Sequence, residues 1–285
     1  MKRKNIMRLS IASYSFHRLL QAGKQDMFGY IKASQQLGAT ELDPWNGHLA
    51  TLRERDPEFK ELEDGPLLNP VEEAYLEDVR AAGKQAGLPF SCLAIDGAHI
   101  YEDSAEARRA NRRLAYRWME AAARLGCSQV RIDAGGSAEL PDEMLAVISE
   151  GYKDLIERAA KMGIEVLIEN HWGPSPVPEN VIRILEGSPG LGLLFDTNNW
   201  AAGRQLDGWQ MCARYARSCH IKSFGFDENG RDPSVDLEKA MHILLEHGYD
   251  GCWGVESSPT DGDETGAVEK TFALIRRTLA AAGKS

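Results

Sequence analysis

The sequence predicts a single α/β domain folded as a (β/α)8 TIM barrel. Strand-like runs alternate with helical patterns along the chain and form eight pairs,. The length of 285 residues suits a barrel, which typically has about 250 residues. In the second half, successive strand-like runs are separated by one helix and two loops, as in a barrel,.

The first half of the chain supplies four strand and helix pairs. Apolar runs predict strands at 8–16, 39–45, 88–96 and 128–136, and helical periodicity predicts helices at 26–37, 71–86, 105–125 and 142–162,. Gly38 can end the first of these helices in the left-handed conformation. The AGG sequence at 134–136 lacks the spacing of a nucleotide-binding loop, so we expect a tight turn after its strand,.

The charged segment 46–70 interrupts this alternation. It contains three prolines and several turn signals, and it is too irregular for one helix and long for a barrel connection. We therefore expect an insertion over the barrel mouth, within a single domain that spans 1–285.

The second half supplies the other four pairs. Strands are predicted at 163–170, 190–199, 218–226 and 251–258, with helices at 178–185, 207–216, 236–246 and 266–282,. Eight pairs favour a closed barrel over an open doubly wound sheet, which usually has fewer strands.

The composition limits the classes of partner. There are 33 basic and 43 acidic residues, for a net charge of −10, which argues against nucleic acid or an anionic membrane surface. Five scattered cysteines without a CxxC pair suit reduced thiols in the cytosol. No long apolar stretch follows the basic residues 1–8, and no apolar run approaches the ~20 residues that span a bilayer,. We expect a soluble, cytoplasmic protein, with a homo-oligomer left open.

Four residues at the ends of the later strands can bind a hard cation. They are Glu169, Asp196, His220 and Glu256. Because the carboxyl ends of barrel strands meet on one face, we expect these side chains to share one cup. Three carboxylates and one imidazole suit Mn2+, Mg2+ or Co2+ better than structural zinc. The sequence thus predicts one divalent ion, with Mn2+ as the first choice and Mg2+ or Co2+ as alternatives.

Such an ion would support proton transfer on a sugar. An open-sided ion can chelate neighbouring carbonyl and hydroxyl oxygens, acidify the carbon-bound proton beside the carbonyl and stabilise the enediolate. Isomerisation and epimerisation both need one proton removed and another delivered. Glu169 and Glu256 are therefore candidates for metal ligand and acid/base catalyst together.

The four strand ends also carry a resemblance to a known family. IEN at 168–170, FDTNN at 195–199, HIK at 220–222 and VES at 255–257 resemble the metal-binding strand ends of the xylose isomerase-like TIM-barrel superfamily of sugar phosphate isomerases and epimerases. The resemblance covers essentially the whole chain in strand order and is most specific from Gly163 onward. It implies a divalent ion held by the same Glu, Asp, His and Glu, with the two glutamates as the proton-transfer pair.

The chain departs from the ketose 3-epimerases of that superfamily at two positions. They commonly carry His three residues after the strand-six Asp, where this chain has Asn199, and Arg six residues after the strand-seven His, where it has Phe226. Both are substrate contacts in that group, so a free ketohexose is a weaker candidate substrate. The three-zinc DNA repair nucleases with this barrel need further ligand histidines and a site for the DNA backbone that a net charge of −10 does not indicate,.

Further residues near the strand ends are candidates for substrate binding. His171 shares the strand-face parity of Glu169 and Lys222 that of His220, so both are expected to point toward the cup. The alternatives are a turn-capping role for His171 and a simple ion pair for Lys222. Specificity residues at or near the ends of strands two, three and four are Trp45, His99, Arg131 and Asp133, and Asn199, three residues after Asp196, is a further candidate for substrate binding,.

These observations predict a metal-dependent sugar or polyol isomerase or epimerase of carbohydrate metabolism. Its partner would be a small-molecule sugar or polyol, with no nucleic acid and no membrane. An inosose-type keto-polyol dehydratase is an alternative, because it uses the same ion and the same first proton abstraction. A barrel that binds a ligand without turnover is the third possibility.

Overall fold

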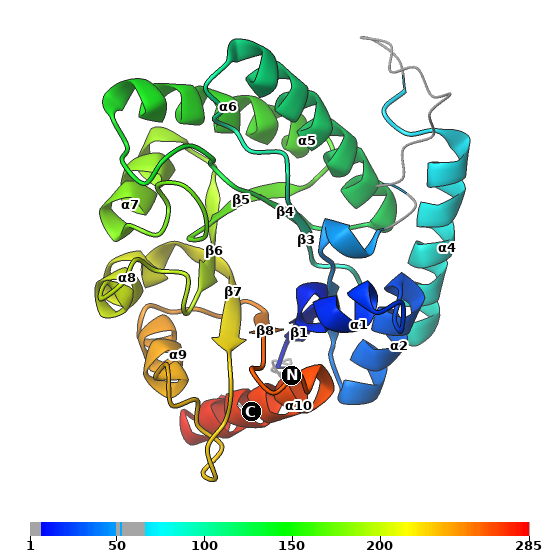
Figure 1. Ribbon diagram of the computed structural model, residues 1–285, viewed down its shortest axis with the longest axis vertical. Coiled ribbons are helices and arrows are strands. Elements are labelled where there is room, and N and C mark those ends of the chain that lie inside the picture. The colour runs from blue at the N-terminus through cyan, green and yellow to red at the C-terminus, as the bar shows by residue number, and fades with distance from the viewer. Residues whose placement is uncertain (1–6, 50–51, 53–65, 285) are drawn as a thin grey trace, which may run out of the picture.

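The computed structural model describes residues 7–49, 52 and 66–284 and confirms the predicted barrel (Figure 1). Eight parallel strands lie in the order β2-β1-β8-β7-β6-β5-β4-β3, and the helices surround them. Between β2 and β3 the barrel is joined by isolated bridges that pair Leu42 with Phe90 and Trp45 with Ala94.

The strands are short and almost entirely buried, as expected where helices cover a parallel sheet,. Their bounds are Leu9–Ala12 (β1), Glu41–Asp43 (β2), Cys92–Ile95 (β3), Gln129–Ile132 (β4), Glu165–Glu169 (β5), Gly192–Asp196 (β6), Ala216–Ser223 (β7) and Trp253–Ser257 (β8).

The helices follow the predicted order. Their bounds are His17–Gln21 (α1), Met27–Leu37 (α2), Pro70–Ala86 (α4), Ala105–Leu125 (α5), Asp142–Ala160 (α6), Pro178–Gly187 (α7), Gln205–Cys212 (α8), Leu237–Glu246 (α9) and Glu264–Ala281 (α10). Short 3-10 helices cover Ser13–Phe16 (η1), Asn46–His48 (η2) and Ala213–Tyr215 (η3). No helix in the described ranges is long and apolar enough to cross a membrane.

Local signals set the helix ends. Gly38 ends α2 with a φ of 80°, the left-handed conformation that glycine adopts without strain. At the start of α4, the Asn69 side chain accepts a hydrogen bond from Glu72 N, and the Glu72 carboxylate accepts one from Asn69 N. This capping box satisfies backbone donors that a helix start leaves unpaired.

The first strand is shorter than the predicted 8–16, because the chain turns into η1 after Ala12. The Ser15 hydroxyl donates to Val255 O and accepts from Ser257 N. These bonds tie η1 to the end of β8, so the segment serves as a loop beside the barrel mouth. The predicted helix at 207–216 likewise ends at Cys212, and β7 begins at Ala216 rather than at 218.

The predicted insertion at 46–70 lies largely outside the described residues, which omit 50–51 and 53–65. Its described part begins with η2 and ends with the residues before α4. Leu49, Leu52 and Leu68 are buried in the main hydrophobic core, so both ends of the segment are anchored to the domain.

Candidate functional site

The four predicted ligands meet at the carboxyl ends of β5 to β8. Glu169 and Asp196 end β5 and β6, Glu256 lies one residue before the end of β8, and His220 lies three residues before the end of β7. Each offers one ligand atom, and these atoms lie within 4.8 Å of one another. The register of the strands helps to bring the side chains together, because Asp196 lies opposite His220 in the sheet and Lys222 lies opposite Glu256. All four side chains are buried.

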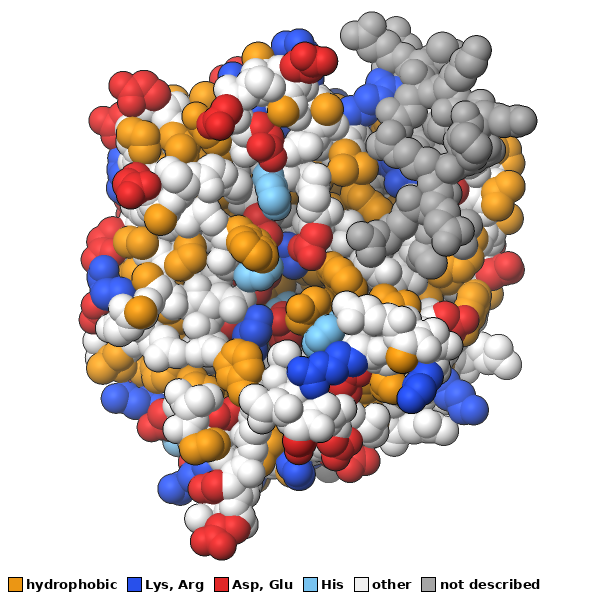
Figure 2. All heavy atoms as spheres, in the orientation of Figure 1, with side chains coloured by type: hydrophobic (Ala, Val, Ile, Leu, Met, Phe, Trp, Pro, Cys, Tyr) orange, Lys and Arg blue, Asp and Glu red, His pale blue; other side chains and the backbone are white. Residues whose placement is uncertain are grey.

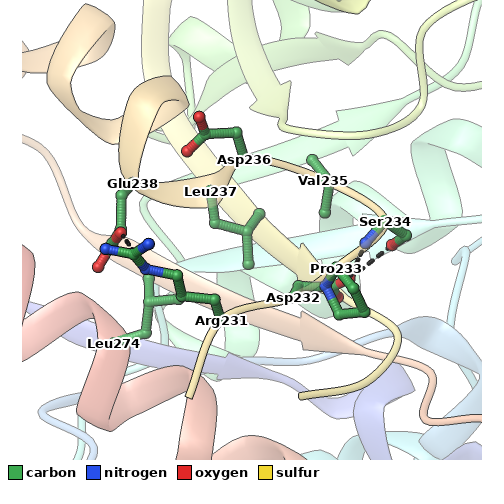
Figure 3. A pocket seen from close by; sticks show the side chains of 9 residues that line it. All are labelled: Arg231, Asp232, Pro233, Ser234, Val235, Asp236, Leu237, Glu238 and Leu274. Atoms are coloured by element: carbon green, nitrogen blue, oxygen red, sulfur yellow. Dashed lines mark hydrogen bonds and ion pairs between the residues drawn. The ribbon is translucent and has the colours of Figure 1, made fainter. Parts of the chain in front are cut away.

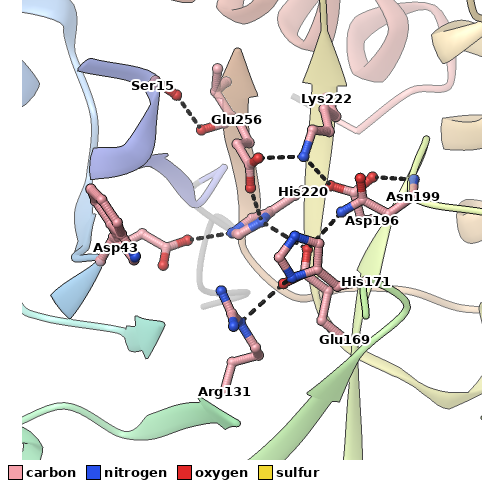
Figure 4. A network of polar contacts seen from close by, with 12 residues as sticks. Ser15, Asp43, Arg131, Glu169, His171, Asp196, Asn199, His220, Lys222 and Glu256 are labelled. Carbon is pink, nitrogen blue, oxygen red and sulfur yellow. Dashed lines mark hydrogen bonds and ion pairs between the residues drawn. The ribbon is translucent and has the colours of Figure 1, made fainter. Parts of the chain in front are cut away.

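The imidazole of His220 sets the centre of this cluster (Figure 4). Its Nδ1 atom lies 3.0 Å from Glu256 Oε2 and 3.8 Å from Glu169 Oε1. Its Nε2 atom faces away and lies 3.2 Å from Asp43 Oδ2. A proton on Nε2 would bind this carboxylate and leave Nδ1 as the nitrogen available to a cation, the usual arrangement for a metal-binding histidine.

The loop after β6 orients Asp196. The Asn170 side chain accepts a hydrogen bond from Asp196 N and donates one to Asp196 O. The Oδ1 atom of Asp196 accepts from the backbone N–H groups of Asn198 and Asn199. One carboxylate oxygen is therefore used by the loop, and the other remains for a ligand.

The donor set fits a divalent cation. Among the described residues, Asp196 Oδ2 is a buried atom without a hydrogen-bond partner, which is costly unless something else binds it. In an octahedral Mg2+ site with bonds of about 2.1 Å, ligand atoms lie about 3 to 4 Å apart. The cluster is close to that size, and its three carboxylates and one imidazole suit Mg2+, Mn2+ or Co2+.

Two buried cations flank the cluster. Arg131 Nε lies 3.0 Å from Glu169 Oε2, and its NH1 group donates to Asp133 and Asp96 at 2.9 and 2.8 Å. On the other side, Lys222 Nζ donates to Glu256 Oε1 at 2.5 Å. Each glutamate thus has one oxygen held by a cation and the other turned toward His220.

Burial raises the pKa values of the carboxylates, and these cations lower them. Burial raises the pKa of Glu256, but Lys222 and His220 outweigh it and hold that pKa well below the usual range,. The same balance, through Arg131, His171 and His220, lowers the pKa of Glu169. For Asp196, burial prevails over the attraction of Lys222 and raises the pKa to about 6.

A pocket of about 120 Å3 opens over the cluster, and Asp43, His220, Lys222 and Glu256 line it. Aromatic residues form part of its wall, and the rings of Tyr14 and Trp45 meet edge to face at 5.2 Å. Figure 2 shows the mouth of the barrel as a hollow in which charged and histidine side chains lie among hydrophobic ones. Of the four ligands, His220 and Glu256 line this pocket and are therefore reachable by a small molecule.

Of the predicted substrate contacts, Trp45, Arg131, His171 and Lys222 line this pocket, whereas Asp133 and Asn199 are not among its lining residues. The His171 ring lines it, and its Nδ1 atom is 3.2 Å from Asp133 Oδ2. The Trp45 indole donates from Nε1 to Asp96 Oδ2 at 2.7 Å. The Asn199 side chain donates to Glu169 Oε1 at 3.2 Å. Each of these residues thus contacts a carboxylate of the site.

His99 lies elsewhere. It follows β3 by four residues and lines a separate pocket, where its Nδ1 atom is 3.6 Å from Glu102 Oε1. The predicted strand at 88–96 ends within one residue of the observed end at Ile95, so His99 lies in the loop that follows. The longer loop carries the side chain away from the four ligands.

Three residues of the site were absent from the sequence prediction. Asp43 contacts His220, Asp96 contacts Trp45 and Arg131, and Asn170 orients Asp196. Asp43 ends β2 and Asp96 directly follows β3, so the strand-end rule used for the later strands would have found both. Asn170 directly follows Glu169, and its role depends on the neighbouring strand.

A further pocket lies at the loop before α9 and is lined by residues 231–238 and Leu274 (Figure 3). The Asp232 carboxylate accepts hydrogen bonds from Phe224 N and from Ser234. Arg231 pairs with Glu238 at 3.2 Å. These charges serve to hold the loop together.

Comparisons with known proteins agree with this fold. The model of a family described as xylose isomerase-like TIM barrel matches residues 52–278. Two C-glycoside deglycosidase alpha subunits match part of the chain. That from Microbacterium trichothecenolyticum is 34% identical over 100 residues, which are 30% of this chain and 27% of that protein. That from Arthrobacter globiformis is 39% identical over 92 residues, 32% and 24% of the two chains. The matches span only about a quarter of each relative.

Solved structures share the fold at low identity. The 3-keto-D-glucoside 4-epimerase of E. coli superposes with a TM-score of 0.70 at 16% identity, over 95% of this chain and 100% of that one. A probable 3-DHS dehydratase of Bacillus anthracis gives 0.67 at 13%, over 95% and 99%. A xylose isomerase-like protein of Mycobacterium smegmatis in complex with magnesium gives 0.70 at 17%, over 99% of each chain. At these identities the likeness shows the fold.

Proposed function

Because the chain belongs to the xylose isomerase-like TIM-barrel family, we propose that it is a divalent-metal-dependent sugar or polyol isomerase or epimerase. One observation carries the proposal. Three buried carboxylates and one buried imidazole offer ligand atoms within 4.8 Å of one another beside a pocket. Such a group is costly to assemble unless a cation or a reaction uses it.

The ion would be held by Glu169, Asp196, His220 and Glu256, with Mn2+ as the first choice and Mg2+ or Co2+ as alternatives. When bound, it would draw electron density from a substrate carbonyl and so acidify the neighbouring carbon-bound proton. The magnesium complex of the structurally similar Mycobacterium smegmatis protein supports a hard cation in this fold.

The residues of the chain supply the proton transfers. Glu169 and Glu256 come from β5 and β8 and approach His220 from two sides, so one can take a proton from carbon while the other delivers one,. Arg131 and Lys222 orient the second oxygen of each glutamate. His171 and Trp45, which line the pocket, would contact the sugar hydroxyls or ring, and Asp133 and Asn199 would act through His171 and Glu169, which they contact.

The test is exchange of the substrate's carbon-bound proton with solvent. In D2O, the metal-loaded protein should exchange the proton beside the carbonyl of a keto-sugar, followed by NMR. Glu169→Gln and Glu256→Gln should each slow exchange at least about 100-fold. Glu179→Gln, a change at an exposed surface ion pair with Arg204, is the control. Exchange at the wild-type rate in both site variants would refute the assigned roles.

Loss of metal must be separated from loss of the proton carrier, because both glutamates are also ligands. Elemental analysis of each variant gives the ion content per chain. About one Mn, Co or Mg per wild-type chain is expected. A variant that keeps its ion but loses exchange identifies a proton carrier, whereas a wild type that binds none of the three ions would favour a non-catalytic binding barrel.

A lyase is the second candidate, and the contact between His171 and Asp133 favours it. Elimination differs from isomerisation in that the second proton goes to the departing hydroxyl rather than to carbon. His171, which lines the pocket and lies 3.2 Å from Asp133, would supply that proton,. The structural similarity to a probable 3-DHS dehydratase is consistent with this reaction type. The mass of the product distinguishes the two reactions, because elimination of water lowers it and isomerisation leaves it unchanged.

A further inference from the structure

Trp172 joins the pocket over the four ligands to a second and larger one. Its side chain is 57% exposed, although large aromatic side chains are mostly buried in folded proteins. It lines both the pocket of about 120 Å3 and a neighbouring pocket of about 440 Å3. Its ring meets the ring of His171 edge to face at 4.9 Å. The indole therefore forms a shared wall between the candidate reaction site and the second pocket.

The second pocket is formed by loops that follow β3, β4 and β5. Its apolar surface comes from Tyr101, Met144 and Trp172, and Glu102 and Asp103 lie at its edge. None of the described residues that line it is Lys or Arg. His99 lies 3.6 Å from Glu102 Oε1, and Arg108 donates from outside the lining to the backbone oxygens of Glu102 and Asp103. The two carboxylates at the edge repel anionic groups such as phosphate. The lining thus favours an uncharged, flat ligand.

Three glycines contribute only backbone atoms to the lining of the second pocket. Gly135, Gly136 and Gly173 line it and have φ values of 73°, 82° and 63°. A Cβ atom at Gly173 would lie 2.4 Å from Gly135 O, and one at Gly136 would lie 2.9 Å from Met144 Sδ. Side chains are thereby excluded from the place where the two loops touch. These three glycines therefore leave no side chain of their own in the pocket beside Trp172.

The first pocket holds little more than one ring. Sites that enclose a drug-sized ligand have volumes of about 300–1,000 Å3, well above the 120 Å3 found over the four ligands. A substrate of two rings would place one ring there and extend past Trp172 into the second pocket. The flat face of an indole suits the apolar face of a sugar or an aromatic ring.

We propose that the second pocket binds the uncharged second ring of a glycoside whose reacting sugar lies over the four ligands. The substrate class is then a neutral glycoside rather than a free or phosphorylated monosaccharide. This inference rests on the proposed function for the identity of the reacting sugar. The second-ring site itself rests on Trp172, the adjoining pockets and their charges.

The test compares binding of phenyl β-D-glucopyranoside and methyl β-D-glucopyranoside to the Mn2+-loaded protein by calorimetry. Neither probe carries a keto group, so binding is measured without enolisation. We expect the phenyl glucoside to bind at least about tenfold more tightly than the methyl glucoside. Trp172→Ala should reduce this preference to less than twofold, and Tyr101→Leu should reduce it partly. Phe28→Ala, which removes another exposed aromatic ring, should leave it unchanged.

Equal affinities for the two glucosides, a preference that survives in Trp172→Ala, or no binding of the phenyl glucoside would each overturn the second-ring site. The proposed function fails separately. A protein that prefers the phenyl glucoside through Trp172 but exchanges no carbon-bound proton retains the second-ring site and loses the isomerase assignment. A protein that exchanges the proton of a free keto-sugar but shows no preference between the glucosides retains the isomerase assignment and loses the second-ring site.

Discussion

At the residue scale, the contact between His220 and Asp43 decides how the imidazole meets the other ligands. Asp43 Oδ2 lies 3.2 Å from His220 Nε2, and the Ser10 hydroxyl donates to the same oxygen at 3.3 Å. This arrangement turns Nδ1 toward the carboxylates of Glu169 and Glu256. A carboxylate behind a ligand histidine fixes its orientation and increases its basicity.

Asp43→Asn should therefore weaken Mn2+ binding by about 10- to 100-fold without unfolding the protein, because the amide orients the ring less strongly than the carboxylate. Calorimetric titration with Mn2+ measures the change. Asp142→Asn is the control, since Asp142 pairs with Arg183 on the surface. A dissociation constant within twofold of wild type would show that Asp43 does not position His220.

His48 predicts a pH dependence of stability. The side chain is buried, and neither ring nitrogen has a hydrogen-bond partner among the described residues. Burial lowers its pKa from 6.5 to about 4. Because the unfolded chain binds the proton more tightly, His48 stabilises the fold above pH 6.5, and this contribution is lost as the pH falls toward 4.

The free energy of unfolding should lose about 2 kcal/mol through His48 between pH 7.5 and pH 5. His48→Gln should reduce the pH dependence by that amount, as measured by urea unfolding at both pH values. His242→Gln, the same change at an exposed histidine on α9, serves as the reference. An identical pH dependence in wild type and His48→Gln would contradict the assignment.

At the scale of elements, the loops after the strands decide which predicted residues reach the site. The loop after β5 begins with Asn170 and His171 and keeps His171 beside Asp133, whereas the longer loop after β3 carries His99 to the second pocket. The loops after β4 and β5 touch through Gly135 and Gly173. Strand ends therefore define the metal cluster, and loop packing defines the surrounding pockets.

Gly173→Ala should destabilise the protein by more than the roughly 1–2 kcal/mol expected for a left-handed alanine, because its Cβ would lie 2.4 Å from Gly135 O. Gly203→Ala is a matched control, with a φ of +75° and no atom within 4 Å of the added Cβ. Chemical unfolding of both variants gives the comparison. An equal decrease in the free energy of unfolding in both variants would mean that the loops after β4 and β5 are not closely packed.

At the scale of the whole molecule, the four ligands connect strands across half of the barrel, so an ion would stabilise the entire domain. At a free Mn2+ concentration 100 times the dissociation constant, binding adds about 2.7 kcal/mol to the free energy of unfolding. For a domain of this size, that corresponds to a rise in Tm of about 5 °C.

Differential scanning calorimetry with and without Mn2+ measures this rise, and Asp196→Asn should reduce it because the amide is a weaker ligand than the carboxylate. Asp142→Asn should show the wild-type shift. A full shift in Asp196→Asn would place the stabilising ion elsewhere in the molecule.

The sequence by itself determined the barrel and the four candidate ligands. Periodicity and strand-end position are local properties, and in a parallel barrel the carboxyl ends of strands far apart in sequence share one face. Glu169, Asp196, His220 and Glu256 could therefore be grouped without knowing any contact. The same rule applied to the shorter strands β2 and β3 would have added Asp43 and Asp96.

Only the tertiary structure decided which side chains touch. The contact between Asp43 and His220 joins residues 177 positions apart, and the pairing of Arg131 with Glu169 depends on how β4 and β5 pack and on the rotamers of both side chains. The two pockets that meet at Trp172 depend on loop paths set by backbone packing. Sequence patterns record which face a residue occupies, whereas distances between side chains follow from packing the whole chain.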